Sequence, residues 1–259
     1  MNPQQLIDAL PTFRVSSAGS PQALADLTLQ AAAQSVPLLA QLSEALGHPP
    51  LRPVPVESFV FNEASQKAAS ALKQLFDQHG SDKANAHNYH HLYGAILHNP
   101  EAVSAIFEVG LGTNNEDVVS NMGVHGKPGA SLRAFRDYLP NAQIIGADVD
   151  RRVLFEEERI RTFFIDQTDQ TVIDALAASI DLSFDLIIDD GLHSPNANLA
   201  MLTFALKKLR PGGVFVVEDV HPAHFPVWQV VSALLPPLGF KSFFATASGG
   251  CLFVIQSFR

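Results

Sequence analysis

Residues 105–115 read A-I-F-E-V-G-L-G-T-N-N, an apolar run that ends in two glycines, Gly110 and Gly112. Such a run predicts a buried β-strand followed by a tight turn, in which the backbone can approach a ligand closely. A dinucleotide-binding turn has the spacing G-x-G-x-x-G and opens directly into a helix, whereas Asn115 stands here in place of the third glycine. The stretch therefore predicts the first strand of an α/β sheet, with either a ligand-binding turn or a tight turn without a ligand.

Further apolar, β-rich runs follow this strand at regular spacing, at 142–148, 160–166, 184–189 and 212–220. Segments with helical spacing separate them, near 131–139, 151–158, 170–179 and 195–209. Near-continuous apolar strands that alternate with helices predict a parallel sheet covered on both faces. After a predicted helix over 225–235, two β-rich runs flank Ser248-Gly249-Gly250, which predicts an antiparallel hairpin. We expect a mostly parallel seven-stranded sheet with a terminal hairpin over residues 99–259.

The first 98 residues show helical periodicity and no convincing strand. A helix is expected over 21–46, with Ser20 as its N-cap, Pro21 as its first residue, and a kink or division at Pro37. The proline-rich stretch 47–56 predicts a linker, and two more helical stretches follow it at 63–78 and 86–97. Residues 1–98 are therefore expected to form a helical N-terminal region.

The composition is that of an ordinary globular protein, with 47% hydrophobic and 17% charged residues in 259. The net charge of −9 argues against a nucleic acid or an anionic membrane surface as partner. The single cysteine, Cys251, excludes an internal disulfide and a cysteine-based zinc site. No signal peptide is evident, and no apolar run approaches the ~18 residues that a membrane span needs. We expect a cytoplasmic protein that acts on a small molecule.

Polar side chains follow the second and third predicted strands. Asp148 ends I-I-G-A-D, and a carboxylate there can accept both hydrogen bonds of a ribose diol. Asp150 competes for that role, and a surface aspartate is the simpler alternative. Asp166 and Gln167 follow the third strand, where they could recognise an adenine amino group or cap the next helix. Together these residues predict a nucleoside-containing ligand.

The ordered set E-V-G-x-G (108–112), A-D (147–148), D-Q (166–167) and L-R-P-G-G-V (209–214) resembles the class I S-adenosylmethionine-dependent methyltransferases. The predicted hairpin matches the reversed last strand of that family. The stretches 81–89, 131–142, 165–169 and 189–193 (S-D-K-A-N-A-H-N-Y, S-L-R-A-F-R-D-Y-L-P-N-A, I-D-Q-T-D and D-D-G-L-H) resemble the metal-dependent sugar O-methyltransferases of macrolide and related pathways. The resemblance covers about residues 100–259.

The resemblance implies a Rossmann-like fold, S-adenosylmethionine as cofactor, and a hydroxyl of a small, glycosylated natural product as methyl acceptor. This chain departs from the subgroup in a shorter N-terminal part, in Ala84 where D-K-G is usual, and in the insert 121–129. These departures bear on which acceptor is methylated more than on how the methyl group is transferred. The N-terminal region would cover the cofactor, shape the acceptor pocket or contact another subunit, which leaves a homo-oligomer open.

Carboxylates end the fourth and fifth predicted strands, which are neighbours in the strand order of that family. Repulsion among Asp189, Asp190, Glu218 and Asp219 would be costly unless a cation or protons balanced it. Hard oxygen ligands suit Mg²⁺. The resemblance places the metal ligands at Asp189, Glu218 and Asp219, and the catalytic base at His193. Asp190 would replace Asp189 on the metal or orient His193.

The remaining predictions concern the cofactor and the rival interpretations. The cofactor-binding residues are expected to be Lys83, Tyr89, Glu108, Gly110, Gly112, Asn115, Asp148, Asp166, Gln167 and Asp189. His87 and His91, four apart on a predicted helix, form a weaker candidate for a zinc site. A metal-independent methyltransferase is the nearest alternative function. A nicotinamide-dependent oxidoreductase and a non-catalytic adenosyl-binding partner are the more distant ones.

Overall fold

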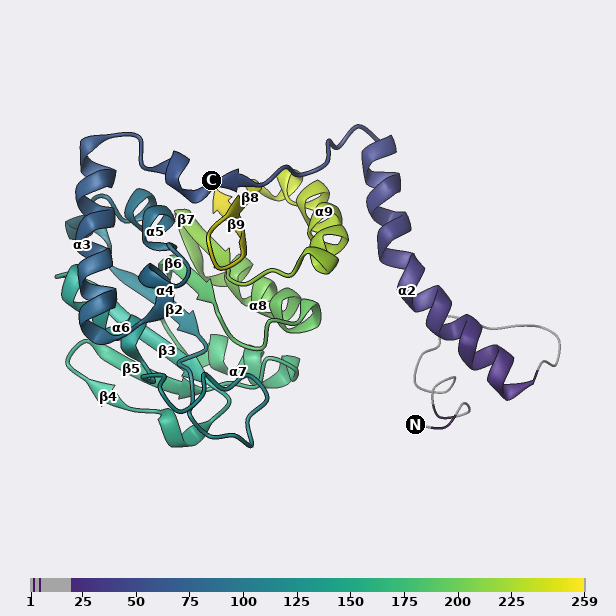
Figure 1. Ribbon diagram of the computed structural model, residues 1–259, viewed down its shortest axis with the longest axis horizontal. Helices are drawn as coiled ribbons and strands as arrows, with labels where there is room; N and C mark the ends of the chain where they lie inside the picture. Colours follow the sequence, from purple (N-terminus) through teal and green to yellow (C-terminus); the bar gives the residue numbers. More distant parts are fainter. Residues whose placement is uncertain (1, 3–4, 6–19, 259) are drawn as a thin grey trace. The chain divides into compact units, whose positions relative to one another are not determined.

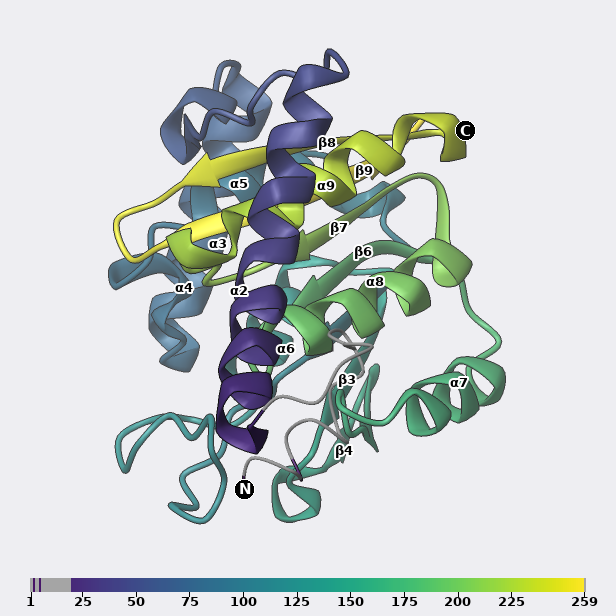
Figure 2. The same ribbon diagram turned by 90° about the vertical axis from the view of Figure 1, so that its right-hand side faces the viewer.

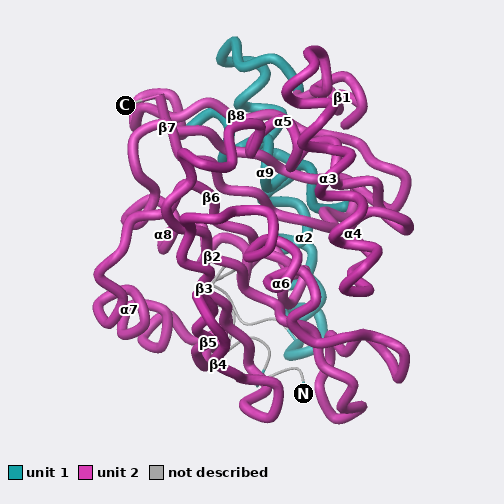
Figure 3. The backbone as a smooth tube through the Cα atoms, turned by 90° about the vertical axis from the view of Figure 1, so that its left-hand side faces the viewer, with its two compact units in different colours: residues 1–50, 223–234 teal, residues 51–222, 235–259 magenta. Residues whose placement is uncertain are grey.

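The fold is that of a computed structural model, which describes residues 2, 5 and 20–258 (Figure 1). The chain forms two compact units, one of residues 1–50 and 223–234 and the other of residues 51–222 and 235–259 (Figure 3). Residues 51–98 thus belong to the same unit as the central sheet. The division at residue 98 drawn from the sequence stays a prediction.

The larger unit is built on one nine-stranded sheet with the order β1-β8-β9-β7-β6-β2-β3-β5-β4. Its strands β8, β9, β7 and β6 follow one another in Figure 2. Its five long parallel strands are those that the sequence predicts: β2 (Ala105–Val109), β3 (Gln143–Asp148), β5 (Ile160–Phe164), β6 (Phe184–Asp189) and β7 (Leu209–Val217). The predicted hairpin is also present, as β8 (Phe240–Thr246) and β9 (Cys251–Ser257), with β9 antiparallel to β7. Two short strands, β1 (Val54–Pro55) and β4 (Glu156–Glu157), raise the predicted seven strands to nine.

The helix predicted at 151–158 is wrong. The Asp150 side chain accepts a hydrogen bond from the Arg152 backbone and starts a 3-10 turn, η3 (Arg151–Val153), instead of an α-helix. Beyond it, Arg159 has a φ of 60°, and the chain reverses so that β4 pairs antiparallel with β5. A local cap and a tight reversal that pairs β4 with the adjacent strand β5 therefore override the helical spacing of this segment.

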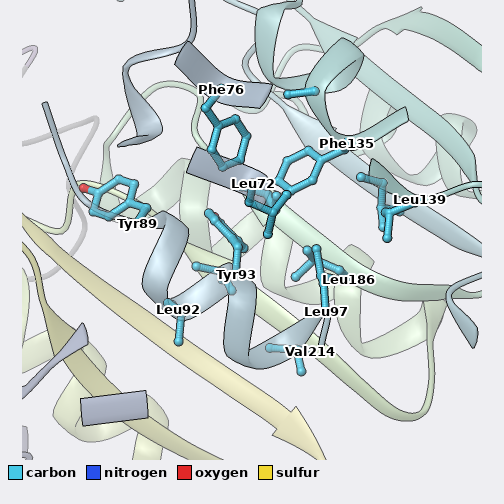
Figure 4. Packing of buried hydrophobic residues seen from close by; sticks show 14 of the residues in the cluster. Leu72, Phe76, Tyr89, Leu92, Tyr93, Leu97, Phe135, Leu139, Leu186 and Val214 are labelled. Atoms are coloured by element: carbon cyan, nitrogen blue, oxygen red, sulfur yellow. The ribbon is translucent and has the colours of Figure 1, made fainter. Parts of the chain in front are cut away.

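Helices cover both faces of the sheet, as the alternation of elements predicts. Three of them, α3 (Glu63–His79), α5 (His90–Ile96) and α6 (Ala130–Tyr138), pack together on one face, where the Phe135 ring lies edge-on to Phe76 at 5.3 Å and to Tyr93 at 5.5 Å (Figure 4). The other helices beside the sheet are α7 (Gln170–Ser179) and α8 (Pro195–Lys208), and Phe204 of α8 contacts Phe107 of β2 at 4.8 Å. The core therefore lies on both sides of β2 and β6.

The segment before the sheet leads from α3 toward the carboxyl edge of the strands. Helix α3 ends at Gly80, which has a φ of 80°, and Ser81 then caps the short helix α4 (Asp82–Asn85). The helix expected over 86–97 is shorter, because Asn88 has a φ of 48° and α5 begins only at His90. A Cβ on Gly94 of α5 would lie 2.5 Å from the Ala69 backbone nitrogen, so α5 packs closely on α3.

The smaller unit contains α2 (Pro21–Ala45) and α9 (Phe225–Leu234), which contact each other. The predicted cap is confirmed, because the Ser20 side chain accepts a hydrogen bond from the Ala23 backbone at 3.2 Å. Helix α2 continues through Pro37, so the alternative of a division there is wrong.

Within residues 20–258, no helix has the length and apolar character needed to cross a membrane. The remaining short helices are η1 (Val56–Phe59), η2 (Pro100–Ala102), η4 (Pro222–His224) and η5 (Pro236–Leu238).

We expect His90 to make the fold sensitive to mild acid. Burial, together with the neighbouring His91 ring, lowers the pKa of His90 from 6.5 to about 4. Between those values the unfolded chain binds a proton that the folded chain does not, so stability falls as the pH drops below 6.5. At pH 5 the loss is about 2 kcal/mol, and His90→Asn should remove it.

Thermal unfolding of the wild type and of His90→Asn at pH 7 and pH 5 measures this effect. The same substitution at the exposed His98 is the control and should leave the pH dependence of the wild type intact. An equal fall in melting temperature for His90→Asn and the wild type would contradict the assignment.

Candidate functional site

A cavity of about 850 Å³ lies beyond the carboxyl ends of the parallel strands in the larger unit. Its wall includes most of the sequence-predicted residues: Lys83, Gly110, Gly112, Asp148, Asp166, Gln167, Asp190, His193 and Asp219. Five predicted residues do not line it: Tyr89, Glu108, Asn115, Asp189 and Glu218. The cavity therefore lies where parallel α/β sheets bind ligands. Nine of the predicted residues line it and can contact a ligand, and the other five lie outside its wall.

The glycine turn after β2 is held against the neighbouring strand ends. Gly110 has a φ of 93°, and a Cβ there would lie 2.0 Å from the Asp190 carbonyl oxygen. Asp148 accepts hydrogen bonds from the backbone of Leu111 and of Asp150, each at 2.8 Å. Each carboxylate oxygen has a second lone pair, so Asp148 can hold this turn and still accept from a ligand. Burial raises the pKa of Asp148.

Asp150, the competitor for the role of Asp148, is occupied by protein donors. It accepts hydrogen bonds from Thr113 and Asn115, both at 2.7 Å, and from the guanidinium group of Arg152 at 2.6 Å. The Arg152 contact holds the pKa of Asp150 well below its usual range. Asn115 thus ties the glycine turn to Asp150 and lies outside the cavity wall.

Asp166 and Gln167 differ in what they contact. Asp166 accepts hydrogen bonds from the backbone and hydroxyl of Thr168, while Asp169 provides the cap of α7. Gln167 donates to Asp189 at 2.8 Å and accepts from the Leu192 backbone at 2.9 Å. A Cβ on the intervening Gly191 would lie 2.0 Å from the Gln167 side-chain oxygen, so the contact needs a glycine there. Gln167 therefore fixes the shape of the D-D-G-L-H stretch.

The two adjacent aspartates of this stretch point to different surroundings. Asp189 is fully buried, and its carboxylate accepts one hydrogen bond from Gln167 and one from Asn198 at 2.9 Å. Burial raises the pKa of Asp189 despite these two bonds. Asp190 lines the cavity and is about a quarter exposed. The preference for Asp189 as the metal ligand is not supported by this geometry.

An ion cluster centred on the Lys83 ammonium group lies at the cavity wall, with the buried Glu108 and Glu218 behind it. The Lys83 ammonium nitrogen lies 2.5 Å from Glu218, 2.7 Å from Asp190 and 3.3 Å from Glu108. Burial alone would lower the pKa of Lys83, but these carboxylates raise it well above its ordinary value. Burial and the neighbouring Asp190 raise the pKa of Glu218.

Two hydroxyl groups that sequence reasoning missed complete the buried cluster. Tyr93 donates to Glu218, and Ser131 donates to Glu108 at 2.9 Å. Tyr93 ends the stretch H-N-Y-H-H-L-Y, which contains the two histidines of the weaker zinc candidate. Ser131 begins the stretch S-L-R-A-F, which is part of the family resemblance. Nothing in their spacing indicated a carboxylate partner, because the partners lie 23 and 125 positions away along the chain.

Asp190, His193 and Asp219 gather at the cavity surface. Their potential ligand atoms all lie within 4.8 Å of one another, and among the described residues no other group of three has this arrangement. The His193 Nε2 atom lies 3.9 Å from Asp190 and 4.0 Å from Asp219. His193 and Asp219 have φ values of 52° and 53°, a strained conformation that often occurs at functional sites.

The residues around Asp219 support this arrangement. Tyr89 donates a hydrogen bond to Asp219, and burial raises the pKa of Tyr89 well above its usual range. His87 stacks on Tyr89 with ring centroids 5.0 Å apart, and its Nδ1 lies 3.8 Å from Asp219. His87 and His91 are not brought together with a third ligating side chain in the part of the chain that the structure describes. The zinc pair proposed for these two histidines is therefore not found.

The chain is similar to methyltransferases of natural-product pathways. A family model described as a methyltransferase domain matches residues 62–220. The chain is 29% identical over 168 residues to 8-demethyl-8-alpha-L-rhamnosyl tetracenomycin-C 2'-O-methyltransferase of Streptomyces olivaceus, a match that covers 64% of this chain and 42% of the relative. Over 99 residues it is 39% identical to mycinamicin VI 2''-O-methyltransferase of Micromonospora griseorubida, which covers 38% of this chain and 24% of that one.

A solved structure extends this similarity. The structure of MycE, a methyltransferase of the mycinamycin biosynthetic pathway in complex with Mg, SAH and mycinamycin VI, aligns with a TM-score of 0.51 at 27% identity. The alignment covers 61% of this chain and 39% of that one. The chain thus spans less than half the length of these relatives.

Proposed function

Because the chain belongs to the methyltransferase domain family that matches residues 62–220, we propose that it transfers a methyl group from S-adenosylmethionine to a hydroxyl of a small, glycosylated acceptor. The family match confirms the predicted class I fold. The observation that carries the proposal is a single cavity that is lined both by a glycine turn with Asp148 and by Asp190, His193 and Asp219. One end of this cavity can take a nucleoside, and the other can activate a hydroxyl.

The nucleoside end is proposed to lie along the ends of β2, β3 and β5. Gly110 and Gly112 leave the turn free of side chains, and Asp148 accepts from the ribose hydroxyls through its unused lone pairs. Asp166 and Gln167 line the wall where an adenine ring would follow. The residues that support the cavity wall without lining it are Glu108, Asn115 and Tyr89, because each is hydrogen-bonded to another protein group.

A divalent cation is proposed to bind at Asp190 and Asp219. The Lys83 ammonium group contacts three carboxylates, those of Glu108, Asp190 and Glu218. Asp219 lies beside Asp190 at the cavity surface, so one lysine faces four carboxylates, and a cation would balance the remaining negative charge. Carboxylate oxygens are ligands that Mg²⁺ prefers. A cation there would stabilise the negative charge that develops on the acceptor oxygen. Glu218 lies behind this position, because Lys83 and Tyr93 hold both of its oxygens.

His193 is proposed to remove the proton from the acceptor hydroxyl. A hydroxyl is a poor nucleophile while it holds its proton, and an imidazole is suited to accept that proton near pH 7. Its Nε2 atom lies 3.9 Å from Asp190 and 4.0 Å from Asp219, so the base would lie beside the proposed cation position, where the acceptor oxygen would be held. The deprotonated oxygen can then attack the methyl group in line with the departing sulfur.

Calorimetry with S-adenosylhomocysteine and with NADH, each with and without Mg²⁺, tests the proposal. We expect S-adenosylhomocysteine to bind and NADH not to bind. Binding of NADH alone would favour an oxidoreductase, and binding of neither would favour a non-catalytic partner. Turnover that is insensitive to EDTA would favour the metal-independent alternative.

A cytoplasmic location, the absence of nucleic-acid and membrane partners, and an open oligomeric state stay predictions from the sequence.

Asp148→Asn is expected to weaken S-adenosylhomocysteine binding by about 10- to 100-fold, because a hydrogen bond to a charged group contributes roughly 1.5–3 kcal/mol. Asparagine keeps the size of the side chain but replaces one accepting oxygen with a donor. Asp174→Asn, at an exposed position of α7, is the matched control. A binding constant within twofold of the wild type for Asp148→Asn would remove Asp148 from the cofactor site.

A further inference from the structure

The Lys83 side chain joins three carboxylates that come from three different strand ends. Glu108 belongs to β2, Asp190 follows β6 and Glu218 follows β7, and the ammonium nitrogen lies within 3.3 Å of an oxygen of each. An ammonium group has three N–H donors, so one can point to each carboxylate. Only 2% of the Lys83 side chain is exposed.

Glu218 shows why this contact bears on cation binding. One of its oxygens accepts from Lys83 at 2.5 Å and the other accepts from Tyr93. A divalent cation that bound Glu218 directly would have to displace the ammonium group or share its position. The same ammonium group also holds one oxygen of Asp190 at 2.7 Å, which leaves the other oxygen to face His193 and the cavity.

We propose that Lys83 is a built-in cation of this site. Its ammonium group occupies the inner cation position between Glu108 and Glu218, and it confines a divalent cation to the outer position at Asp190 and Asp219. Lys83 is then a positioning residue, because its side chain reaches the cavity wall while its ammonium group contacts the carboxylates. This inference rests on the proposed cation site, and it predicts that the positive charge of Lys83 limits how tightly that site binds a divalent ion.

Binding of Mn²⁺ to the purified full chain, followed by calorimetry, tests the inference without any measurement of methyl transfer. Lys83→Met removes one positive charge within a few ångströms of the site, so Mn²⁺ should bind at least about tenfold tighter than in the wild type. The double substitution Lys83→Met with Glu218→Gln removes one charge of each sign and should return the affinity toward that of the wild type. Lys73→Met, at an exposed lysine of α3, is the control.

An unchanged Mn²⁺ affinity in Lys83→Met would overturn the inference, and so would an equal gain in the double variant. If Lys83→Met does not fold alone, its thermal unfolding with Mn²⁺ takes the place of the titration. Mn²⁺ or the added Glu218→Gln should then restore the fold, and failure of both would show that Lys83 does not act through its charge. S-adenosylhomocysteine binding by the wild type separates these outcomes from failure of the proposed function.

Discussion

Replacing His193 by asparagine is expected to reduce methyl transfer by about 10²–10⁴-fold at saturating cofactor and acceptor, the usual contribution of a general base. Asparagine is close in size and tolerates the left-handed backbone that His193 adopts at a φ of 52°. The loop should therefore keep its shape while the proton acceptor is lost. S-adenosylhomocysteine binding should change little, because the nucleoside end of the cavity lies along other strand ends.

The measurement is single-turnover transfer to a hydroxyl acceptor, together with calorimetry of S-adenosylhomocysteine on the same preparation. His98→Asn, at an exposed position after α5, is the matched control and should retain the wild-type rate. Full turnover in His193→Asn would exclude His193 as the base. A parallel loss of turnover and of S-adenosylhomocysteine binding would instead indicate that His193 supports the cavity itself.

The fold could be predicted well where the sequence signal is local. The strands β2, β3, β5, β6 and β7 are apolar runs with polar residues at their carboxyl ends, and such runs form buried parallel strands because both faces are covered. The two-residue strands β1 and β4 could not be predicted, because each is an edge strand too short to show a pattern of its own. β1 pairs with β8, far along the chain, whereas β4 pairs with the adjacent β5, and this local reversal replaces the helix expected at 151–158.

The sequence could predict only those site residues that closely follow a predicted strand. The sequence places Asp148, Asp190, His193 and Asp219 at the carboxyl edge, and the structure brings them to one cavity. It does not reveal the role of Lys83, which reaches the cluster from α4, outside the sheet. The partners of Lys83 lie 25 to 135 positions further along the chain, a separation over which spacing carries no information.

The sequence also could not show which of the adjacent residues Asp189 and Asp190 faces the cavity. Successive residues of a strand point to opposite faces, so adjacent aspartates at a strand end meet different surroundings. The sequence gives no sign of which one faces the ligand. The partner that decides it, Asn198, lies nine residues further on in α8 and caps the buried carboxylate of Asp189 from behind.

Asp190→Asn and Asp189→Asn are therefore expected to differ in Mn²⁺ affinity. Loss of the cavity-facing carboxylate should weaken Mn²⁺ binding by at least about 100-fold in Asp190→Asn, because even indirect partners of a metal contribute 10- to 100-fold. The melting temperature of Asp190→Asn should also fall, because the buried Lys83 ammonium group loses a charged partner 2.7 Å away. In Asp189→Asn, the new amide group would face a donor from Gln167 or Asn198, and Mn²⁺ affinity should change much less.

An unmatched donor at this fully buried position costs about 1–3 kcal/mol, so the melting temperature of Asp189→Asn should fall by several degrees. Thermal unfolding and Mn²⁺ calorimetry on both variants measure the two effects separately. The reverse pattern, with Mn²⁺ affinity lost in Asp189→Asn and retained in Asp190→Asn, would restore Asp189 as the metal ligand. In the arrangement seen here, Asp189 holds the loop through two amide groups, and that rigidity lets His193 keep its strained backbone beside Asp190 at the cavity surface.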